Sequence, residues 1–444
     1  MAGLTVQQRS IIGTLFAAAP DAAVRRLEMA LSEEVDQGGP LAEVHALVAK
    51  ETAERKVRAT VLAPILGLCR PSDLGDRRFA PVVIGKLWAA LRATAPDLVD
   101  TARAACLELE LATWSPDSAY NEVCAYAASA LRAGDPAFAD VARILDAEPG
   151  GLELFLEYLD LAPHGRRALA RLPDWLGRMT EESAAAARLA YRDAESFSDT
   201  AGPRFIEMIL TLLPEPWLIL RILSVVVAGA NDRYLASSEL AQFGEYILRY
   251  IESRLAAFRA FDPDQGRASG VAAAEGLHKA AQAIAEFENA LEMNREGPWG
   301  ARVARAKQHL AEAAEIRLNQ IEKAIDQALP LQLVRFGRGT RGVPKLATDP
   351  DARLLRRAEG FVGFYDEVRN CAASSGFGAV RAKIGAALAA RLDQYVEDLL
   401  ESLRSDEPGD IDRLHAYLDA AASLIGLLQG EKAAQIVRRR SAAA

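Results

Sequence analysis

The sequence predicts an all-α protein in which an N-terminal array of helical hairpins is followed by an elongated antiparallel bundle of long helices. Three observations support this fold class: many segments are dominated by alanine, prolines stand where helices would begin, and apolar residues recur at the helical period. Alanine loses no side-chain entropy in a helix and therefore has the highest helix propensity. Half of the 444 residues are apolar and a quarter are charged, so the chain can form packed cores.

Residues 1–200 form a predicted helical-repeat-like region, because prolines open a series of amphipathic segments there. Proline is favoured at the first helical position, and acidic residues just after it complement the helix dipole. The helices begin about 20 residues apart, so pairs would repeat at about 40 residues, the period of HEAT-like arrays. The segments are too dissimilar to identify a repeat family, and we expect an irregular stack of antiparallel helices. The prolines are Pro20, Pro40, Pro96, Pro116 and Pro136.

Residues 201–230 are the most apolar part of the chain and form a predicted helical junction between the two halves. The apolar segment that begins at Pro216 is interrupted by Arg221. It also falls short of the ~20 residues that cross a bilayer, so a buried helix is favoured over a transmembrane segment. Near the start of the chain, "RSIIGTLFAAAP" belongs to an amphipathic pattern that favours a helix over an export signal.

Residues 231–444 form the predicted bundle, because they carry long apolar stripes at steps of three or four residues with charge on the opposite face. One stripe predicts a single helix from Pro298 to Leu329, which at ~1.5 Å per residue would be about 46 Å long. Turns such as "DPDQG" and "DEPGD" would join antiparallel neighbours. Another stripe consists of Leu240, Phe243, Ile247, Ile251, Leu255 and Phe258.

Sequence motifs predict no catalytic residue, no cofactor and no metal site. Glu275 and His278 match the E-x-x-H pattern of di-metal bundles, and Asp412 and His415 form a related pair. Both pairs fall outside the apolar stripes, so solvent-exposed helix faces are the favoured interpretation. The four cysteines lie far apart, and Cys371 has no histidine near it in the sequence. This cysteine usage favours free thiols in a reducing, cytoplasmic environment.

Residues 330–349 lack a helical pattern and are predicted to form an irregular basic loop. Within "LVRFGRGTRGVPK", residues 337–342 match G-x-G-x-x-G. In dinucleotide-binding folds these glycines follow a strand and open a helix. "LQLVRF" resembles a strand in isolation, but Pro344 stands two residues after the last glycine and no helical pattern resumes before Asp349. A nucleotide site is therefore not favoured.

The charge of this loop and of the residues after it is the main functional signal in the sequence. Between residues 335 and 357, seven cations stand against Asp349 and Asp351, a local charge of +5 in a protein of net charge −9. Guanidinium groups match phosphate and carboxylate, so these cations are candidate contacts for an anionic partner. The alternative is a solvent-exposed loop whose arginines pair with acidic side chains nearby. The cations are Arg335, Arg338, Arg341, Lys345, Arg353, Arg356 and Arg357.

The leading functional hypothesis is a non-enzymatic cytoplasmic scaffold or adaptor that binds a protein partner, with the basic loop as a contact, because extended helical surfaces suit protein recognition. The first alternative is a peripheral binder of anionic ligands, either nucleic acid or an acidic membrane surface, whose affinity falls with salt. The second alternative is an all-helical enzyme with a pocket built from residues far apart in the sequence. Alanine-rich helices also permit self-association through the bundle.

Overall fold

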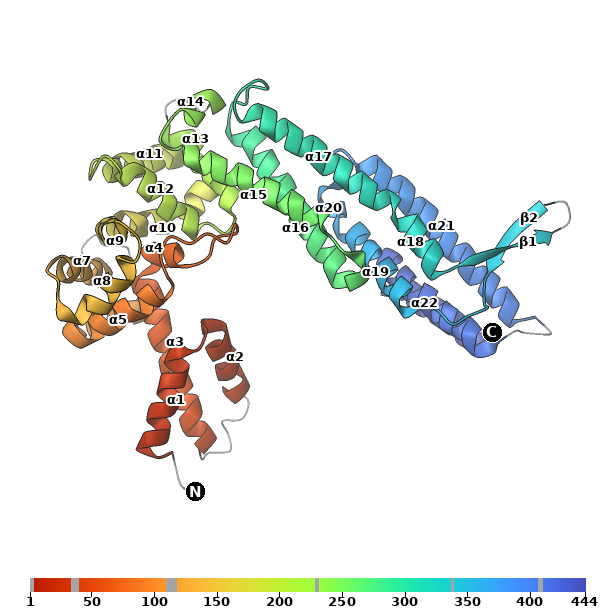
Figure 1. The fold of residues 1–444 in the computed structure, drawn as a ribbon, viewed down its shortest axis with the longest axis horizontal. Coiled ribbons are helices and arrows are strands. Elements are labelled where there is room, and N and C mark those ends of the chain that lie inside the picture. The colour runs from red at the N-terminus through yellow and green to blue at the C-terminus, as the bar shows by residue number, and fades with distance from the viewer. Residues whose placement is uncertain (1–3, 33–39, 109–117, 228–230, 337–338, 406–409) are drawn as a thin grey trace. The chain divides into compact units, whose positions relative to one another are not determined.

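The computed structural model describes residues 4–32, 40–108, 118–227, 231–336, 339–405 and 410–444 (Figure 1). Most of these residues are helical, which confirms the helical character that the sequence predicts. Contacts divide the chain into two compact units, Met1–Val226 and Val227–Ala444. The division falls within the stretch 201–230, where the sequence places a junction.

Unit 1 consists of short and medium-length helices. Successive helices pack on one another, as α2 does on α3, α6 on α7 and α11 on α12. The helices are α1 (Val6–Ala18), α2 (Asp21–Ser32), α3 (Pro40–Val61), α4 (Ala63–Leu66), α5 (Val82–Thr94), α6 (Pro96–Glu108), α7 (Ala119–Arg132), α8 (Ala139–Leu145), α9 (Gly151–Asp160), α10 (Ala162–Leu176), α11 (Glu181–Glu195), α12 (Ala201–Leu212) and α13 (Ile219–Val226).

Four of the five prolines that the sequence places at helix starts stand at or next to the first residue of a helix or helical turn. Pro40 and Pro96 are the first residues of α3 and α6, and α2 begins one residue after Pro20. Pro136 opens a 3-10 turn that leads directly into α8. Pro116 lies outside the described residues. The fixed φ of proline thus sets the beginning of each of these helices at no cost in hydrogen bonds.

The apolar helices α12 and α13 are buried inside unit 1, where they pack on α10 and α11. The deep burial expected for this part of the chain is therefore confirmed. In the described ranges, no helix combines the length and the apolar character that a membrane crossing requires. The buried side chains include Phe205, Ile206, Ile209, Leu220 and Leu223.

A buried arginine joins three helices of unit 1. Arg166 of α10 donates hydrogen bonds to the carbonyl oxygens of Thr60 at 3.0 Å and Val61 at 2.5 Å, which are the last residues of α3. Its Nε also donates to Oδ1 of Asn121 on α7 at 3.2 Å, and its guanidinium lies 4.9 Å from the ring centroid of Tyr120. Carbonyls at a helix C-terminus carry partial negative charge, so this cation stabilises the end of α3.

Unit 2 contains several helices of 16 to 26 residues and, within the described residues, one two-stranded sheet. The helices are α14 (Asp232–Ala236), α15 (Ala241–Arg259), α16 (Arg267–Ala290), α17 (Gly300–Asn319), α18 (Ile321–Ala328), α19 (Ala352–Glu367), α20 (Arg369–Ala372), α21 (Gly378–Leu403), α22 (Ile411–Gln429) and α23 (Glu431–Ala443), and the strands are β1 (Leu331–Phe336) and β2 (Gly339–Pro344).

The long helices of unit 2 lie side by side and bury the apolar stripes that the sequence predicts (Figure 1). Helix α16 packs against α15, α17 and α19, and α22 packs against α21 and α23. Charged residues occupy the exposed faces, which is the expected arrangement for amphipathic helices. The buried stripe of α15 consists of Phe243, Ile247, Ile251, Leu255 and Phe258.

Glycines bring α16 and α19 close together. A Cβ atom on Gly270 would lie 1.9 Å from the carbonyl oxygen of Gly360 and 2.8 Å from the backbone nitrogen of Phe364. These distances leave no room for a side chain at Gly270, so the two backbones are in direct contact there.

The single helix predicted from Pro298 to Leu329 is interrupted in the structure. Helix α17 ends at Asn319, and α18 begins at Ile321. At Gln320 the backbone N–H donates to the carbonyl oxygen of Arg317, three residues earlier, at 3.2 Å. This tighter 3-10 turn replaces one turn of regular α-helix, a feature that a continuous apolar stripe does not reveal.

The irregular loop predicted at 330–349 is largely a β-hairpin. Strands β1 and β2 pair antiparallel, with Leu331 opposite Pro344 and Phe336 opposite Gly339. The two connecting residues, Gly337 and Arg338, lie outside the described residues. A two-residue connection that contains glycine is a common sequence signal for a hairpin, and it outweighs the absence of a long strand pattern here.

Candidate functional site

The β1–β2 hairpin is anchored to two helices of unit 2. Arg341 of β2 forms an ion pair with Asp398 of α21, a carboxylate that is 6% exposed and that also accepts a hydrogen bond from Nε2 of Gln394 at 2.8 Å. At the base of the hairpin, Nη1 of Arg413 on α22 donates to the carbonyl oxygen of Leu346 at 2.9 Å. These contacts fix one side and the base of the hairpin.

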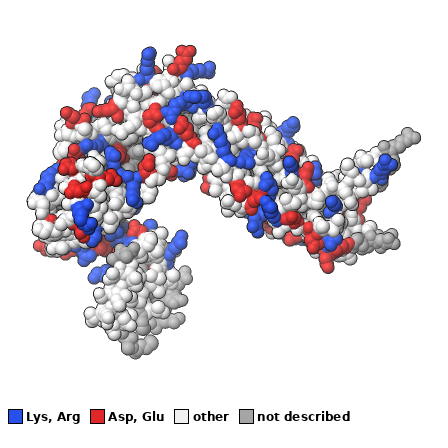
Figure 2. All heavy atoms as spheres, viewed as in Figure 1, with Lys and Arg blue, Asp and Glu red and all other residues white. Residues whose placement is uncertain are grey.

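Strand β1 presents apolar side chains to solvent. Leu333 is 79% exposed, Val334 is 42% exposed and Leu331 is 39% exposed. Leu333 stands opposite Gly342, which has no side chain to cover it. Figure 2 shows the hairpin as a largely uncharged surface with basic residues beside it. An anchored segment with an exposed leucine is a candidate interaction surface, because a partner that covers the leucine would remove its apolar surface from water, which is favourable.

Three of the seven cations that the sequence singles out are engaged in ion pairs. Arg341 binds Asp398, as described above. Arg353 and Arg357, in the first two turns of α19, both bind Asp264, at 3.0 and 2.7 Å. The hydrogen bonds from Arg353 and Arg357 lower the pKa of Asp264 below its usual value. These three arginines therefore have carboxylate partners within unit 2, and the side chain of Arg353 remains 80% exposed.

Three other predicted cations make no ion pair within the described residues. Arg335 on β1, Lys345 after β2 and Arg356 on α19 are all exposed. The side chain of Arg356 lies over Gly266, where an added Cβ would approach its Cγ to 3.0 Å. The seventh cation, Arg338, is outside the described residues. The structure thus brings Arg353 and Arg357 together and leaves Arg335 and Lys345 on the hairpin.

The glycines of the G-x-G-x-x-G pattern do not stand at a helix N-terminus. Gly339 and Gly342 belong to β2, and the next helix, α19, begins at Ala352. A dinucleotide pyrophosphate needs the glycine turn to lead directly into a helix. Gly339 and Gly342 are therefore strand residues and not part of a phosphate-binding turn. The absence of a side chain at Gly342 leaves room for the side chain of Leu331.

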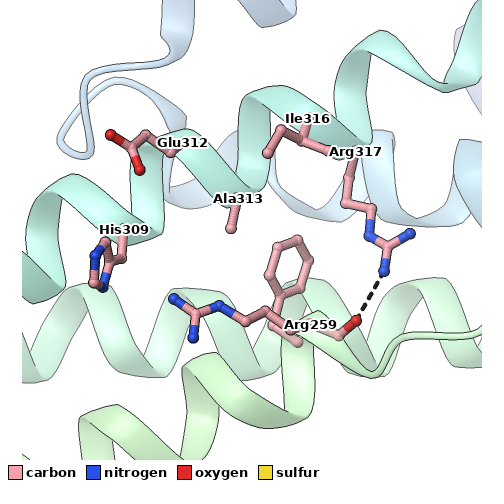
Figure 3. A pocket seen from close by; sticks show the side chains of 7 residues that line it. Arg259, His309, Glu312, Ala313, Ile316 and Arg317 are labelled. Atoms are coloured by element: carbon pink, nitrogen blue, oxygen red, sulfur yellow. Dashed lines mark hydrogen bonds between the residues drawn. The ribbon is translucent and has the colours of Figure 1, made fainter.

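A second candidate site is a groove between α15 and α17, which the sequence reasoning missed. Two adjoining pockets of about 280 Å³ and about 230 Å³ share Arg259 and His309 in their walls. Figure 3 shows the Arg259 side chain extending from α15 toward His309 on α17, with Ala313 beside it and Ile316 farther along α17. The available signal was the spacing of Arg302, Arg305 and His309, since steps of three and four place side chains on one helix face.

The arginines of this groove fall into two groups. Arg302 is occupied by Glu245 at 2.5 Å and Glu252 at 2.8 Å. Arg317 donates to the carbonyl oxygen of Arg259 at 2.9 Å (Figure 3). Arg259 and Arg305 are exposed and make no ion pair in the described part of the chain. The groove therefore contains two guanidinium groups without a carboxylate partner among the described residues, one of which, Arg305, donates from Nε to the carbonyl oxygen of Ala301 at 3.2 Å.

His415 forms a hydrogen bond between its Nδ1 and Oγ of Ser441 at 2.9 Å, and Nδ1 of His278 is buried and finds no hydrogen-bond partner in the described part of the chain. Among the described residues, no group of three or more histidine, cysteine, aspartate or glutamate side chains is arranged to hold a metal ion. Cys371 is buried, and burial raises the pKa of its thiol to about 11, which disfavours the reactive thiolate.

No protein-family model matches the sequence, and comparisons with curated proteins and with solved structures found no significant match. The function is therefore inferred from the geometry of this chain alone.

Proposed function

We propose that the protein is a non-enzymatic cytoplasmic scaffold or adaptor that binds a protein partner through the β1–β2 hairpin. In this proposal, unit 1 provides a HEAT-like array of helical hairpins and unit 2 an elongated bundle from which the hairpin is presented. The observation that carries the proposal is the 79% exposure of Leu333 on a hairpin whose base and inner side are fixed. The anchoring limits the entropy that docking would cost, because the strand is already ordered.

The hairpin suits the addition of a strand from a partner. Within the described residues β1 pairs with β2 alone, so its outer edge has unpaired backbone N–H and C=O groups. Such an edge is a template for a strand of another chain, where main-chain hydrogen bonds give affinity and alternate side chains give specificity. Leu331 and Leu333 lie on one face of β1 and would pack against apolar residues of the added strand.

The charge of the hairpin defines the chemistry of the partner. Residues 331–348 contain four cations and no acidic residue. Of these, Arg335 and Lys345 are exposed and make no ion pair in the described part of the chain. The partner is therefore expected to present an apolar strand flanked by acidic side chains. Affinity for it would fall as salt concentration rises, since exposed ion pairs are screened.

Site-specific photo-crosslinking in cells tests this function. We expect p-benzoylphenylalanine at Leu333 to give one dominant protein adduct. The matched control is Ile436 of α23, which is 58% exposed in the same unit but lies outside the hairpin. Leu333→Lys should abolish binding of the purified adduct protein, and Arg335→Glu should weaken it. The same adducts from both positions, or unchanged binding by Leu333→Lys, would contradict the proposal.

The alternative of an anionic ligand at the hairpin is tested with a different variant. Removing Arg341 would leave the buried carboxylate of Asp398 without its cation and would destabilise the fold. A loss of binding in that variant could therefore result from unfolding. Arg335→Gln together with Lys345→Gln removes only exposed charge. If this double variant lost binding to nucleic acid or to acidic vesicles while still binding the crosslinked protein, the hairpin would have an anion-binding role of its own.

A further inference from the structure

We infer that the groove between α15 and α17 is a binding site for a phosphate monoester attached to a small apolar group. The groove lies in unit 2, and its lining includes Arg259, Arg305, His309 and Ile316. None of these residues belongs to the hairpin, so this site is independent of the function proposed above.

The lining of the groove carries more positive than negative charge. Its lining contains four arginines and two glutamates, in a protein whose net charge is −9. Glu252 shares the cation of Arg302 with Glu245, whereas Glu312 accepts a hydrogen bond at 2.7 Å from the neutral amide of Gln308 and keeps its negative charge. Four arginines against two glutamates leave the lining with a formal charge of +2, and neither Arg259 nor Arg305 has a carboxylate partner among the described residues.

Neighbouring contacts hold the walls of the groove in place. Arg302 bridges from α17 to two glutamates of α15, and Nη2 of Arg317 donates to the carbonyl oxygen of Arg259. These bonds tie the two helices together at both ends of the groove. The side chains of Arg259 and His309 extend toward each other between these ties (Figure 3). A ligand would thus meet a formed site.

The chemistry of the lining indicates the class of ligand. A phosphate monoester has up to two negative charges and three terminal oxygens that accept hydrogen bonds. Guanidinium groups form paired hydrogen bonds to such oxygens, and the imidazole of His309 supplies a further donor. At the other end of the groove Ile316 is 59% exposed beside Ala313, which suits an apolar group bonded to the phosphate. Inorganic phosphate would use only the cationic end.

Titration of the intact protein with phenyl phosphate tests the site. The readout is the NMR signal of the His309 imidazole, identified by its loss in His309→Gln, with affinity measured by calorimetry. We expect phenyl phosphate to bind more tightly than inorganic phosphate. Arg259→Gln and Arg305→Gln should each weaken binding by roughly tenfold, the effect of one hydrogen bond to a charged group. The matched control is Arg295→Gln, since Arg295 is exposed outside the groove.

A third probe distinguishes a soluble ligand from a lipid. Vesicles of phosphatidylcholine with phosphatidic acid carry the same phosphate monoester on a membrane surface. One outcome is that the wild type binds these vesicles but binds phenyl phosphate only weakly, and that the Arg259→Gln, Arg305→Gln double variant does not bind the vesicles. This outcome would support the site, with a lipid headgroup as its ligand. The inference would be overturned if the wild type and the double variant bound all three probes with equal affinity. It would also be overturned if Arg295→Gln weakened binding as much as the groove variants do. Leu333→Lys should leave this binding unchanged.

Discussion

At the scale of the residue, the role of each arginine depends on the partner that the fold supplies. Arg166 is 7% exposed and donates to carbonyl groups at the end of α3, so it stabilises unit 1. Arg341 holds the hairpin through Asp398. The guanidinium group of Arg259 has no carboxylate partner among the described residues, although Arg259, like Arg166, stands in a helix. A sequence therefore reveals where cations lie, but the fold determines which of them remain free.

His164 of α10 should make the stability of unit 1 depend on pH. Burial lowers its pKa, and the nearby Arg167 lowers it further, whereas Asp193 opposes the shift. In the unfolded chain its pKa returns to about 6.5, so below that pH the unfolded state binds more protons than the folded state. We expect the free energy of unfolding contributed by His164 to be fully present above about pH 6.5 and to decrease as pH falls below it.

Urea unfolding at a series of pH values measures this effect. His164→Gln removes the titrating group and should flatten the dependence of the unfolding midpoint on pH between about 5 and 7. The slopes of the two unfolding curves should agree, which would show that the same surface is exposed in both proteins. An equally steep pH dependence in the variant would show that another group is responsible.

At the scale of the element, the sequence predicts most helices but not how closely they pack. Stripes such as Ile247, Ile251 and Leu255 are buried as expected, because the apolar face of an amphipathic helix has to pack on a neighbour. Close contacts through glycine have no such signal. Gly270 and Gly276 both stand in α16, and only the structure shows that the first touches α19 while the second faces open space.

These two glycines give a matched pair of substitutions. Gly270→Ala should destabilise unit 2 by about 1–3 kcal/mol, because its Cβ would overlap the carbonyl oxygen of Gly360. Gly276→Ala should stabilise it by up to about 1 kcal/mol, since alanine is the better helix former and no atom lies within 4 Å of the new Cβ. Chemical denaturation of the two variants checks both signs. Equal effects would mean that helix propensity alone decides the outcome.

The hairpin and the groove show why the candidate sites were only partly predictable. The cations of the hairpin are adjacent in sequence, so their charge is visible at once. The partners of Arg341 and Arg353 lie 57 and 89 residues away, and no local pattern reveals them. The groove unites residues about 50 positions apart, as the pair formed by Arg302 and Glu252 illustrates. Only the packing of α17 on α15 brings these side chains together.

At the scale of the whole molecule, the change in sequence character near residue 230 coincides with a division between two units. Closely spaced prolines give way there to long stripes without internal proline, which changes the length of the helices. Each unit has its own buried core, with Phe205 and Trp175 among the large side chains of unit 1 and Phe258 and Phe364 among those of unit 2. A unit with its own core is expected to fold without the rest of the chain.

Fragments cut at the division test this expectation. Residues 1–226 and 227–444, produced separately, should each be helical by circular dichroism and unfold cooperatively, because their buried side chains are provided from within the unit. The control is a cut between α18 and β1, which separates α16 and α18 from α19 and so opens the packing that joins them. The resulting pieces, 227–329 and 330–444, should unfold without a cooperative transition, since each would expose apolar surface that the other covers. Cooperative unfolding of all four fragments would show that the helices of unit 2 do not depend on the α16–α19 contact for their stability.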